Sequence, residues 1–344
     1  MEGLPVLYTS GLREHLSRTF YIPWSDQGPF LNEGIPAINL GSRSVDNVRA
    51  RALYHTPQDT VENLDVSGVA TFGRAAERIV RTLDELTAIP DESMDSFRLG
   101  RALFIGPVSV LFLHTIVFSP LFLSLFFHFK NHSHSMKPSK EGREILACIA
   151  TFCPFIAIYL TVGLFRKLQL LPAYALYPAT VGDPVLVNPP WGMLCGIFGA
   201  AFIIAVLCVY FYMFAYRSSP KQEFNTSKPI LLCLLIITAI LALLHNSYWA
   251  ATFLSLPCWI WTLVGYSPHR EKRILNWIWI LAAGIPCCAL LWLLAPRFGL
   301  SLNLVWYQIL ALNTGLFSGS GYFLGAFTAA LGIRFMIIQM HSAG

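Results

Sequence analysis

Charge is what this sequence has least of. Only 12% of its 344 residues are Asp, Glu, Lys or Arg, whereas 55% are apolar. An ordinary soluble domain is about 25% charged. The chain therefore has too little polar surface to be a water-soluble globule throughout, and it is too apolar for a disordered or fibrous protein.

Paired cysteines and an export signal are also missing. None of the eight cysteines has the spacing of a zinc ribbon or a redox motif, and all lie in apolar runs, where they are expected to act as small buried hydrophobes. Residues 1–8 contain a glutamate and a proline but no basic cluster before an apolar core, so we expect that they do not begin a secretory signal peptide. We expect no nucleic-acid partner.

The few charges are unevenly distributed. Residues 1–98 contain 9 basic and 14 acidic side chains, a net charge of −5, whereas residues 99–344 contain 15 and 5, a net charge of +10. The division predicts two domains in different solvents, residues 1–98 in water and residues 99–344 in a membrane.

Residues 99–344 contain long apolar runs without any Asp, Glu, Lys or Arg. A helix needs about 20 apolar residues to cross a bilayer. We count seven such runs and predict six to eight spans. The fourth and fifth are expected to form a tight hairpin, and the last to be one tilted helix or a broken pair. The runs are 102–127, 145–165, 191–216, 230–244, 248–266, 274–295 and 304–333.

The basic residues between the runs predict an orientation. If residues 1–98 face away from the cytoplasm, the cytoplasmic loops hold 11 Lys and Arg side chains and the opposite loops hold 5. Because basic loops stay cytoplasmic, residues 1–98 are expected on the periplasmic, extracellular or lumenal side of an integral, multi-pass membrane protein. The only candidate ionisable groups in the spans are His114, inside the first run, and His245, just after the fourth. This scarcity counts against an ion-coupled transporter or a channel.

Residues 1–98 read as the end of an α/β domain. A short helix is expected at residues 28–32 and an apolar strand at 35–40. Asp65 is expected to cap a long amphipathic helix, whose apolar residues recur every three or four positions from Val69 to Leu86. The predicted fold class is therefore an α/β fragment followed by an all-α polytopic membrane bundle.

Four short motifs in this region resemble a known family. They are SDQGPF at 25–30, EGIPA at 33–37, YHTPQDT at 54–60 and ENLD at 62–65. Together they are similar to the last third of the di-zinc aminopeptidases, a family that includes leucyl aminopeptidases and glutaminyl cyclases. Its membrane-anchored branch resembles the endoplasmic reticulum metallopeptidases. The resemblance covers about residues 20–87.

The resemblance implies a zinc site. His55 matches the zinc-binding histidine of the family's His-Thr-x-x-Asp-Thr motif, and Asp59 could fix its ring. Asp26 matches an aspartate that lines the family's site, although it could equally cap a short helix. Gln27 stands where the family has a histidine. In the complete family domain the cofactor is a pair of zinc ions and the substrate is a peptide.

The other donors of a two-zinc centre are missing from the family's positions. Such a centre needs about five side-chain ligands and a carboxylate that accepts a proton from the bridging water. Residues before His55 contain none of the family's His-x-Asp or Glu-Glu patterns. We therefore predict weak zinc binding and negligible peptidase activity for this chain.

Three functions stay open from the sequence. The first is a membrane-anchored zinc metallopeptidase, of which this sequence contains the C-terminal third of the catalytic domain and the membrane region. The second is a catalytically inactive membrane interaction protein derived from such a peptidase. The third is a channel or transporter with a vestigial ectodomain, which the uncharged runs disfavour. The short first region and the absence of an export signal favour the first function over the second.

Overall fold

The computed structural model describes most of the helical part of the chain and parts of the N-terminal region. The described residues are 11–20, 60–87, 97–99, 103–132, 138–172, 188–215, 220–265, 267, 269–289, 303–314 and 318–341. The chain divides into two compact units, one formed by Met1–Phe20 with Phe97–Gly344 and the other by Tyr21–Ser96. Each unit is described by itself.

The described part of the first unit consists mainly of helices. Its elements are α1 (Leu12–Phe20), β1 (Phe97–Arg98), β2 (Phe104–Ile105), α5 (Pro107–Val117), α6 (Ser119–His132), α7 (Pro138–Lys167), α9 (Trp191–Ala215), α10 (Pro220–His245), α11 (Ser247–Leu263), α12 (Arg270–Ala282), α14 (Leu304–Thr314) and α15 (Gly319–His341). Two short strands, which pair antiparallel, precede helix α5 in the chain.

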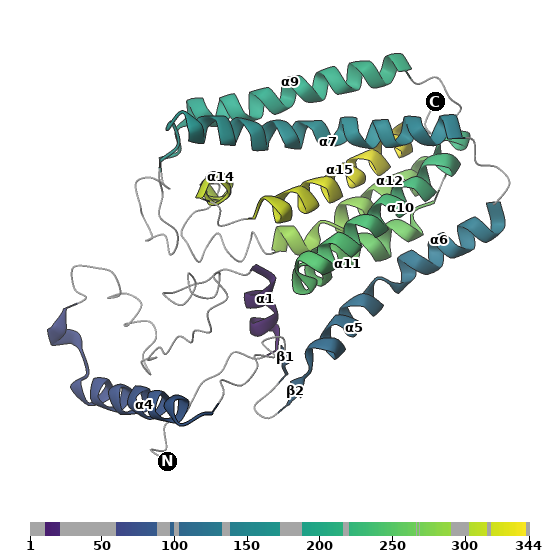
Figure 1. Cartoon of the computed structure of the whole chain (residues 1–344). Coiled ribbons are helices and arrows are strands. Elements are labelled where there is room, and N and C mark those ends of the chain that lie inside the picture. The colour runs from purple at the N-terminus through teal and green to yellow at the C-terminus, as the bar shows by residue number, and fades with distance from the viewer. Residues whose placement is uncertain are drawn as a thin grey trace. The chain divides into compact units, whose positions relative to one another are not determined.

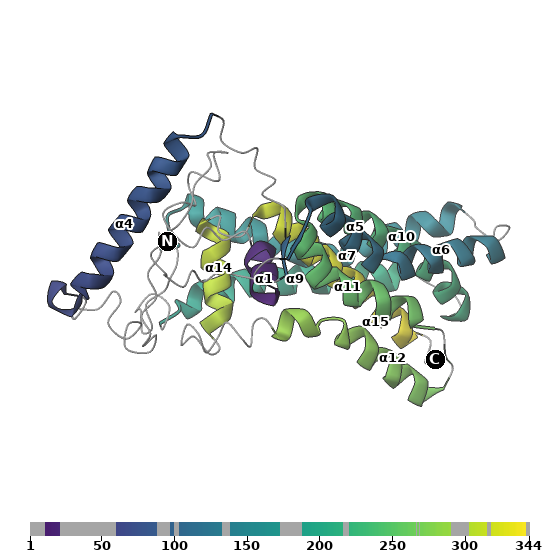
Figure 2. The same cartoon turned by 90° about the horizontal axis from the view of Figure 1, so that it is seen from below.

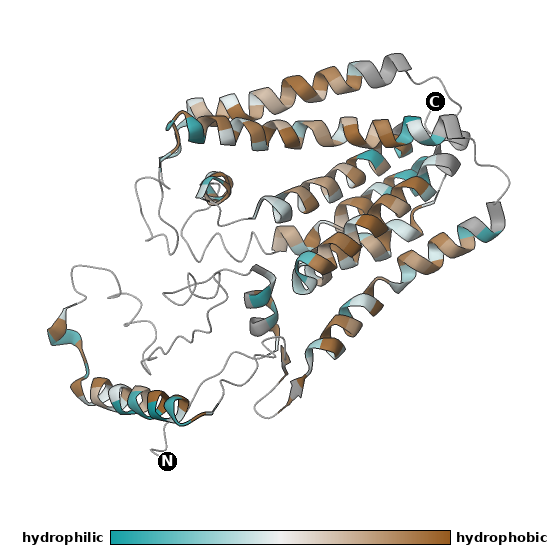
Figure 3. Ribbon diagram, in the orientation of Figure 1, coloured by the Kyte–Doolittle hydropathy of each residue, from teal (hydrophilic) through white to brown (hydrophobic). Residues whose placement is uncertain are grey.

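Four helices are long and apolar enough to cross a membrane. The candidate spans are Glu141–Lys167, Trp191–Tyr210, Ser227–His245 and Gly319–Gln339, and the pair formed by α5 and α6 passes the same criteria as a fifth. Figure 3 shows these helices as predominantly hydrophobic along their length. The six to eight predicted spans stay a prediction, because α11, α12 and α14 have only 17, 13 and 11 residues.

The first predicted span is bent rather than straight. Helices α5 and α6 meet at Phe118 with a bend of 44°. Pro120 lies in the first turn of α6 and has no backbone N–H to continue the ladder of α5. Phe118 itself is fully buried, so the bend is fixed by packing.

Two predicted interruptions are present in the structure. Helices α10 and α11 are separated only by Asn246 and pack against each other, which confirms the tight hairpin. The last apolar run is a broken pair, α14 and α15. Figure 1 shows α14 end-on while α15 lies along the page, and Figure 2 shows α14 along its length, so the two helices run in different directions.

The main core lies where α10, α11 and α15 meet. Leu231, Leu235, Leu254 and Leu331 are fully buried there. Gly332 lets α15 approach α11 so closely that an added Cβ would lie 2.9 Å from the ring of Trp261. A second cluster joins α7, α9 and α14 around Trp306, and α7 and α9 lie side by side (Figure 1).

In the second unit the long predicted helix is confirmed. A short 3-10 helix, η1 (Val61–Asn63), precedes α4 (Val66–Asp84), and the Asp65 side chain caps α4 by accepting from the backbone N–H of Ser67 at 3.1 Å. The expected burial of its apolar face is absent from the described residues: no α4 residue is buried, and Val69 is 54% exposed. The predicted helix at 28–32 and strand at 35–40 lie outside the described residues.

Candidate functional site

The residues predicted from the zinc-peptidase motifs cannot be placed in this structure. His55, Asp26, Gln27 and Asp59 all lie outside the described residues. Within the part of the chain that is described, no three His, Cys, Asp or Glu side chains come together in a group that could hold a metal ion. The described residues therefore form no zinc centre.

The carboxylates that follow His55 in the sequence have local structural roles. The side chain of Thr60 is the main cause that lowers the pKa of Glu62, and Ser67 has the same effect on the pKa of Asp65. The Ser67 hydroxyl donates to Asp65 Oδ1 at 2.8 Å. Both acids are fully exposed and start helices, as carboxylates near a helix N-terminus commonly do.

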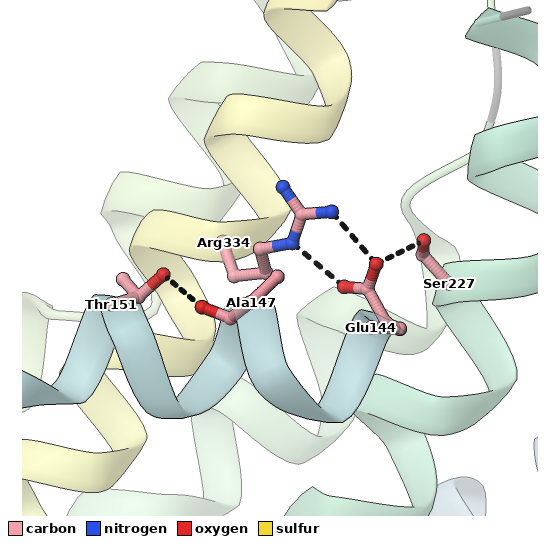
Figure 4. Close-up of polar contacts among 5 residues, drawn as sticks. All are labelled: Glu144, Ala147, Thr151, Ser227 and Arg334. Atoms are coloured by element: carbon pink, nitrogen blue, oxygen red, sulfur yellow. Dashed lines mark hydrogen bonds and ion pairs between the residues drawn. The ribbon is translucent and has the colours of Figure 1, made fainter. Parts of the chain in front are cut away.

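Among the described residues, the most completely buried charged side chains lie instead between three helices of the first unit. Arg334 of α15 donates through Nε and Nη2 to the two carboxylate oxygens of Glu144 on α7, each at 2.7 Å. The hydroxyl of Ser227 on α10 donates to the same carboxylate at 2.7 Å. Figure 4 shows all three side chains converging on this point. The side chains of Glu144 and Arg334 are 2% and 1% exposed.

This pair was not predicted from the sequence, because both residues lie just outside the apolar runs. One run starts at Ile145 and another ends at Ile333, so Glu144 and Arg334 each lie one residue outside a predicted span. The helices continue through both residues. Arg334 was also counted among the loop charges. A carboxylate and a guanidinium at the ends of two apolar runs are the signal that could have suggested the pair.

A second group of polar contacts begins at the next residue of α10. Lys228, next to Ser227, donates to the carbonyls of Thr262 and Val264 at 2.9 and 2.7 Å, where α11 ends. The Gly265 carbonyl accepts from Asn276 and Gln339 at 2.7 and 3.0 Å. These bonds satisfy carbonyls that the end of a helix leaves without a partner. They tie α10, α11, α12 and α15 together.

A third polar site is formed where α1 packs on α11. His15 Nε2 lies 2.8 Å from Thr252 Oγ1, and the hydroxyls of Thr19 and Thr252 are 3.1 Å apart. Arg18 donates to the Tyr248 hydroxyl at 3.2 Å and lies over the Tyr248 ring. We call His15, Arg18, Thr19, Tyr248 and Thr252 the α1 joint. Burial lowers the pKa of His15 from its ordinary value.

Asn246 caps two helices within the same region. Its Oδ1 accepts from the backbone N–H groups of Tyr248 and Trp249 at 3.0 and 3.1 Å, at the start of α11. Its Nδ2 donates to the carbonyls of Arg18 and Thr19 at 2.9 and 3.2 Å, at the end of α1. One amide therefore serves the donors of one helix and the acceptors of another.

The two histidines singled out in the apolar runs have different surroundings. The His114 ring lies edge-on to the rings of His15 and Tyr248, with centroids 5.7 and 4.9 Å away, so it borders the α1 joint. Its Nδ1 is buried and has no hydrogen-bond partner among the described residues. His245 ends α10 and lies 3.2 Å from the Ser318 hydroxyl.

One hollow of about 370 Å³ lies near the ends of α7, α9 and α14. Gln169, Asn188, Met193 and Trp306 are among its lining residues, none of which is acidic or basic. The described lining therefore offers amide and apolar contacts and no acidic or basic side chain.

Comparison with known proteins gives one finding. The model of peptidase family M28 matches residues 9–80, which is about a fifth of the chain. No curated protein and no solved structure matches. The match supports a zinc-peptidase family domain in this part of the chain, and it includes α1 as well as most of α4.

Proposed function

We propose that the protein is a membrane-anchored relative of zinc metallopeptidases. Its residues 9–80 derive from the end of a peptidase domain, and its apolar helices hold that domain at a bilayer. The match of residues 9–80 to peptidase family M28 carries the proposal. The four helices that are long and apolar enough to cross a membrane support the anchoring. The implied reaction of the complete family domain is hydrolysis of a peptide by zinc-bound water.

Within this proposal, His55 is the metal ligand of the chain, and Asp26, Gln27 and Asp59 line the site. The family's other donor patterns are absent from the sequence before His55. Since a two-zinc centre needs about five ligands and a general base, the chain alone would bind zinc weakly and hydrolyse peptides negligibly. The same reasoning supports the second candidate, an inactive interaction protein derived from such a peptidase.

The experiment measures zinc binding and peptide hydrolysis by the full chain in detergent. We expect weak zinc binding by calorimetry that His55→Ala weakens further, and no hydrolysis of an aminoacyl anilide above the buffer rate. His269→Ala is the control, because His269 is an exposed histidine before α12. Zinc binding unaffected by His55→Ala would contradict the assignment of His55. Hydrolysis that depends on His55 would contradict the predicted inactivity and favour a competent peptidase.

A further inference from the structure

Two cysteine side chains from different helices meet between α7 and α9. The thiols of Cys153 on α7 and Cys208 on α9 share a hydrogen bond. Both are free thiols, and both are only partly buried. The two residues are 55 positions apart in the sequence, so no spacing motif indicates the pair.

The packing of α7 against α9 places the two cysteines at the same level. Phe165, near the end of α7, lies against Gly196, near the start of α9, where an added Cβ would be 3.3 Å from the phenyl ring. The two neighbouring helices therefore run antiparallel (Figure 1). Cys153 lies twelve residues before Phe165, and Cys208 lies twelve residues after Gly196. Because both helices have the same rise per residue, equal steps from one contact lead to another.

The backbone beside Cys153 is suited to a small adjustment. A disulfide needs its two sulfur atoms about 2 Å apart, closer than the sulfurs of two hydrogen-bonded thiols. Pro154 directly follows Cys153 inside α7, and its missing N–H removes one backbone hydrogen bond there. Helix α9 is also the least enclosed of the four candidate spans among the described residues, with 17% of its most apolar stretch buried. A local movement can therefore bring the sulfurs together.

We propose that Cys153 and Cys208 are a modification site, which a lipid hydroperoxide oxidises to a disulfide that joins α7 to α9. Both cysteines lie within candidate membrane spans. A peroxide that dissolves in hydrocarbon reaches such a place, whereas a charged, water-soluble disulfide does not. The proposal depends on the anchoring of the apolar helices in a membrane. It involves neither zinc nor peptidase activity.

The reaction has two steps, in which atoms and electrons balance. The sulfur of one thiol attacks the outer peroxide oxygen, the O–O bond breaks, and a sulfenic acid forms. The proton of that thiol goes to the leaving oxygen, which departs as a lipid alcohol. The sulfur of the second thiol then displaces the hydroxyl group of the sulfenic acid, which takes the second thiol proton and leaves as water. The two sulfurs lose two electrons, and the peroxide oxygens gain them.

Peptide mapping of the full chain in nanodiscs tests the site. The bilayer contains a phospholipid hydroperoxide, and remaining thiols are alkylated with N-ethylmaleimide before digestion. We expect a linked peptide that contains Cys153 and Cys208, is lighter than the two thiol peptides by two hydrogen atoms and is separated by dithiothreitol. Cys195, an exposed cysteine on α9, should form no link within the chain. Alkylation of both Cys153 and Cys208, or a link from either to another cysteine, would overturn the proposal.

Two variants separate proximity from general thiol reactivity. In Cys153→Ser the linked peptide should disappear. The double variant Cys208→Ser with Ile204→Cys moves the second thiol by about one turn along α9, or about 6 Å, so the yield of the link to Cys153 should fall about tenfold or more. An unchanged yield would contradict the register of the two helices and with it the site.

Two other oxidants identify the source of the peroxide chemistry. Copper–phenanthroline passes two electrons and two protons from a thiol pair to dioxygen, which becomes hydrogen peroxide. A link that forms with this catalyst but not with the lipid hydroperoxide would refute the assigned oxidant, and a link that forms with neither would refute the pair. Hydrogen peroxide added to the water should form the link more slowly than the lipid hydroperoxide at equal total concentration. A faster reaction with hydrogen peroxide would overturn the lipid source.

Discussion

The ion pair between Glu144 and Arg334 is placed where the environment makes charge most unfavourable. A buried ion pair is stable only if its geometry is good and its remaining polar atoms find partners. Here both carboxylate oxygens accept from the guanidinium, and one also accepts from Ser227. These three residues, the Glu144 triad, therefore specify one arrangement of α7, α10 and α15. Sliding α7 or α15 by one turn would separate the charges, and sliding α10 would break the Ser227 bond.

Removing one partner of this pair should destabilise the protein strongly. Glu144→Gln leaves the Arg334 guanidinium buried beside a neutral amide, and the loss of one partner of a buried pair costs about 3–5 kcal/mol. We expect a large fall in the melting temperature of the protein in detergent. The control is Glu77→Gln, since Glu77 pairs with Arg81 at the same 2.7 Å but on the exposed surface of α4. Equal shifts for the two variants would contradict the argument.

The close approach of Gly332 to Trp261 predicts that a larger residue at position 332 destabilises the protein. A Cβ at residue 332 would lie 2.9 Å from the indole ring, so Gly332→Ala must displace a buried tryptophan or separate α15 from α11. Overpacking of this kind costs about 1–3 kcal/mol. Gly163→Ala is the matched control, because Gly163 is also within a helix but has nothing within 4 Å of the added atom. Thermal unfolding of both variants measures the difference, and an unchanged Gly332→Ala protein would disprove the close approach.

At the scale of the helices, Asn246 sets the geometry of three elements. It ends α10, begins α11 and caps α1. The hairpin can turn within one residue because the side chain replaces the backbone partners that both helix ends need.

Asn246→Asp should separate these roles. The carboxylate still accepts from the first N–H groups of α11, where a negative charge is favourable. It cannot donate to the carbonyls of Arg18 and Thr19, so α1 loses two bonds worth about 1 kcal/mol each. In hydrogen exchange at pH 7.5, α1 should lose protection of tenfold or more while α11 keeps its own. Loss of protection in both helices would contradict this separation of the two roles.

Helix α4 shows which part of an element a sequence can predict. Its start was predicted from Asp65 and its length from the spacing of Val69, Ile79 and Leu86, because caps and periodicity are local properties. The packing of its apolar face is a property of whatever lies against it. The amphipathic pattern does not say which residues cover this face, and in the structure the face is exposed.

For the whole molecule, hydropathy predicted the helices well and their interactions poorly. The apolar runs correspond to described helices, including the hairpin at Asn246 and the break between α14 and α15. The triad at Glu144 could not be predicted by counting charge-free residues, since that count ends each run at the first charge. The α1 joint joins residues more than 220 positions apart, and no local pattern encodes such a contact.

The arrangement of α1 and β1 makes a prediction for the whole chain. The chain leaves the first unit at Phe20 and returns at Phe97, and the rings of His15 and Phe97 are 6.4 Å apart. Since Phe20 is five helical residues beyond His15, or about 7.5 Å, a short Gly-Ser linker should replace residues 21–96. We expect the shortened chain to keep the melting temperature of the first unit. Failure to fold would show that residues 21–96 are needed for its stability.

That two-point attachment makes residues 21–96 an insertion: the chain of the first unit is interrupted after Phe20 and resumes at Phe97. The first unit is therefore assembled from two separate pieces of chain, and α1 is the shorter piece's contribution to it.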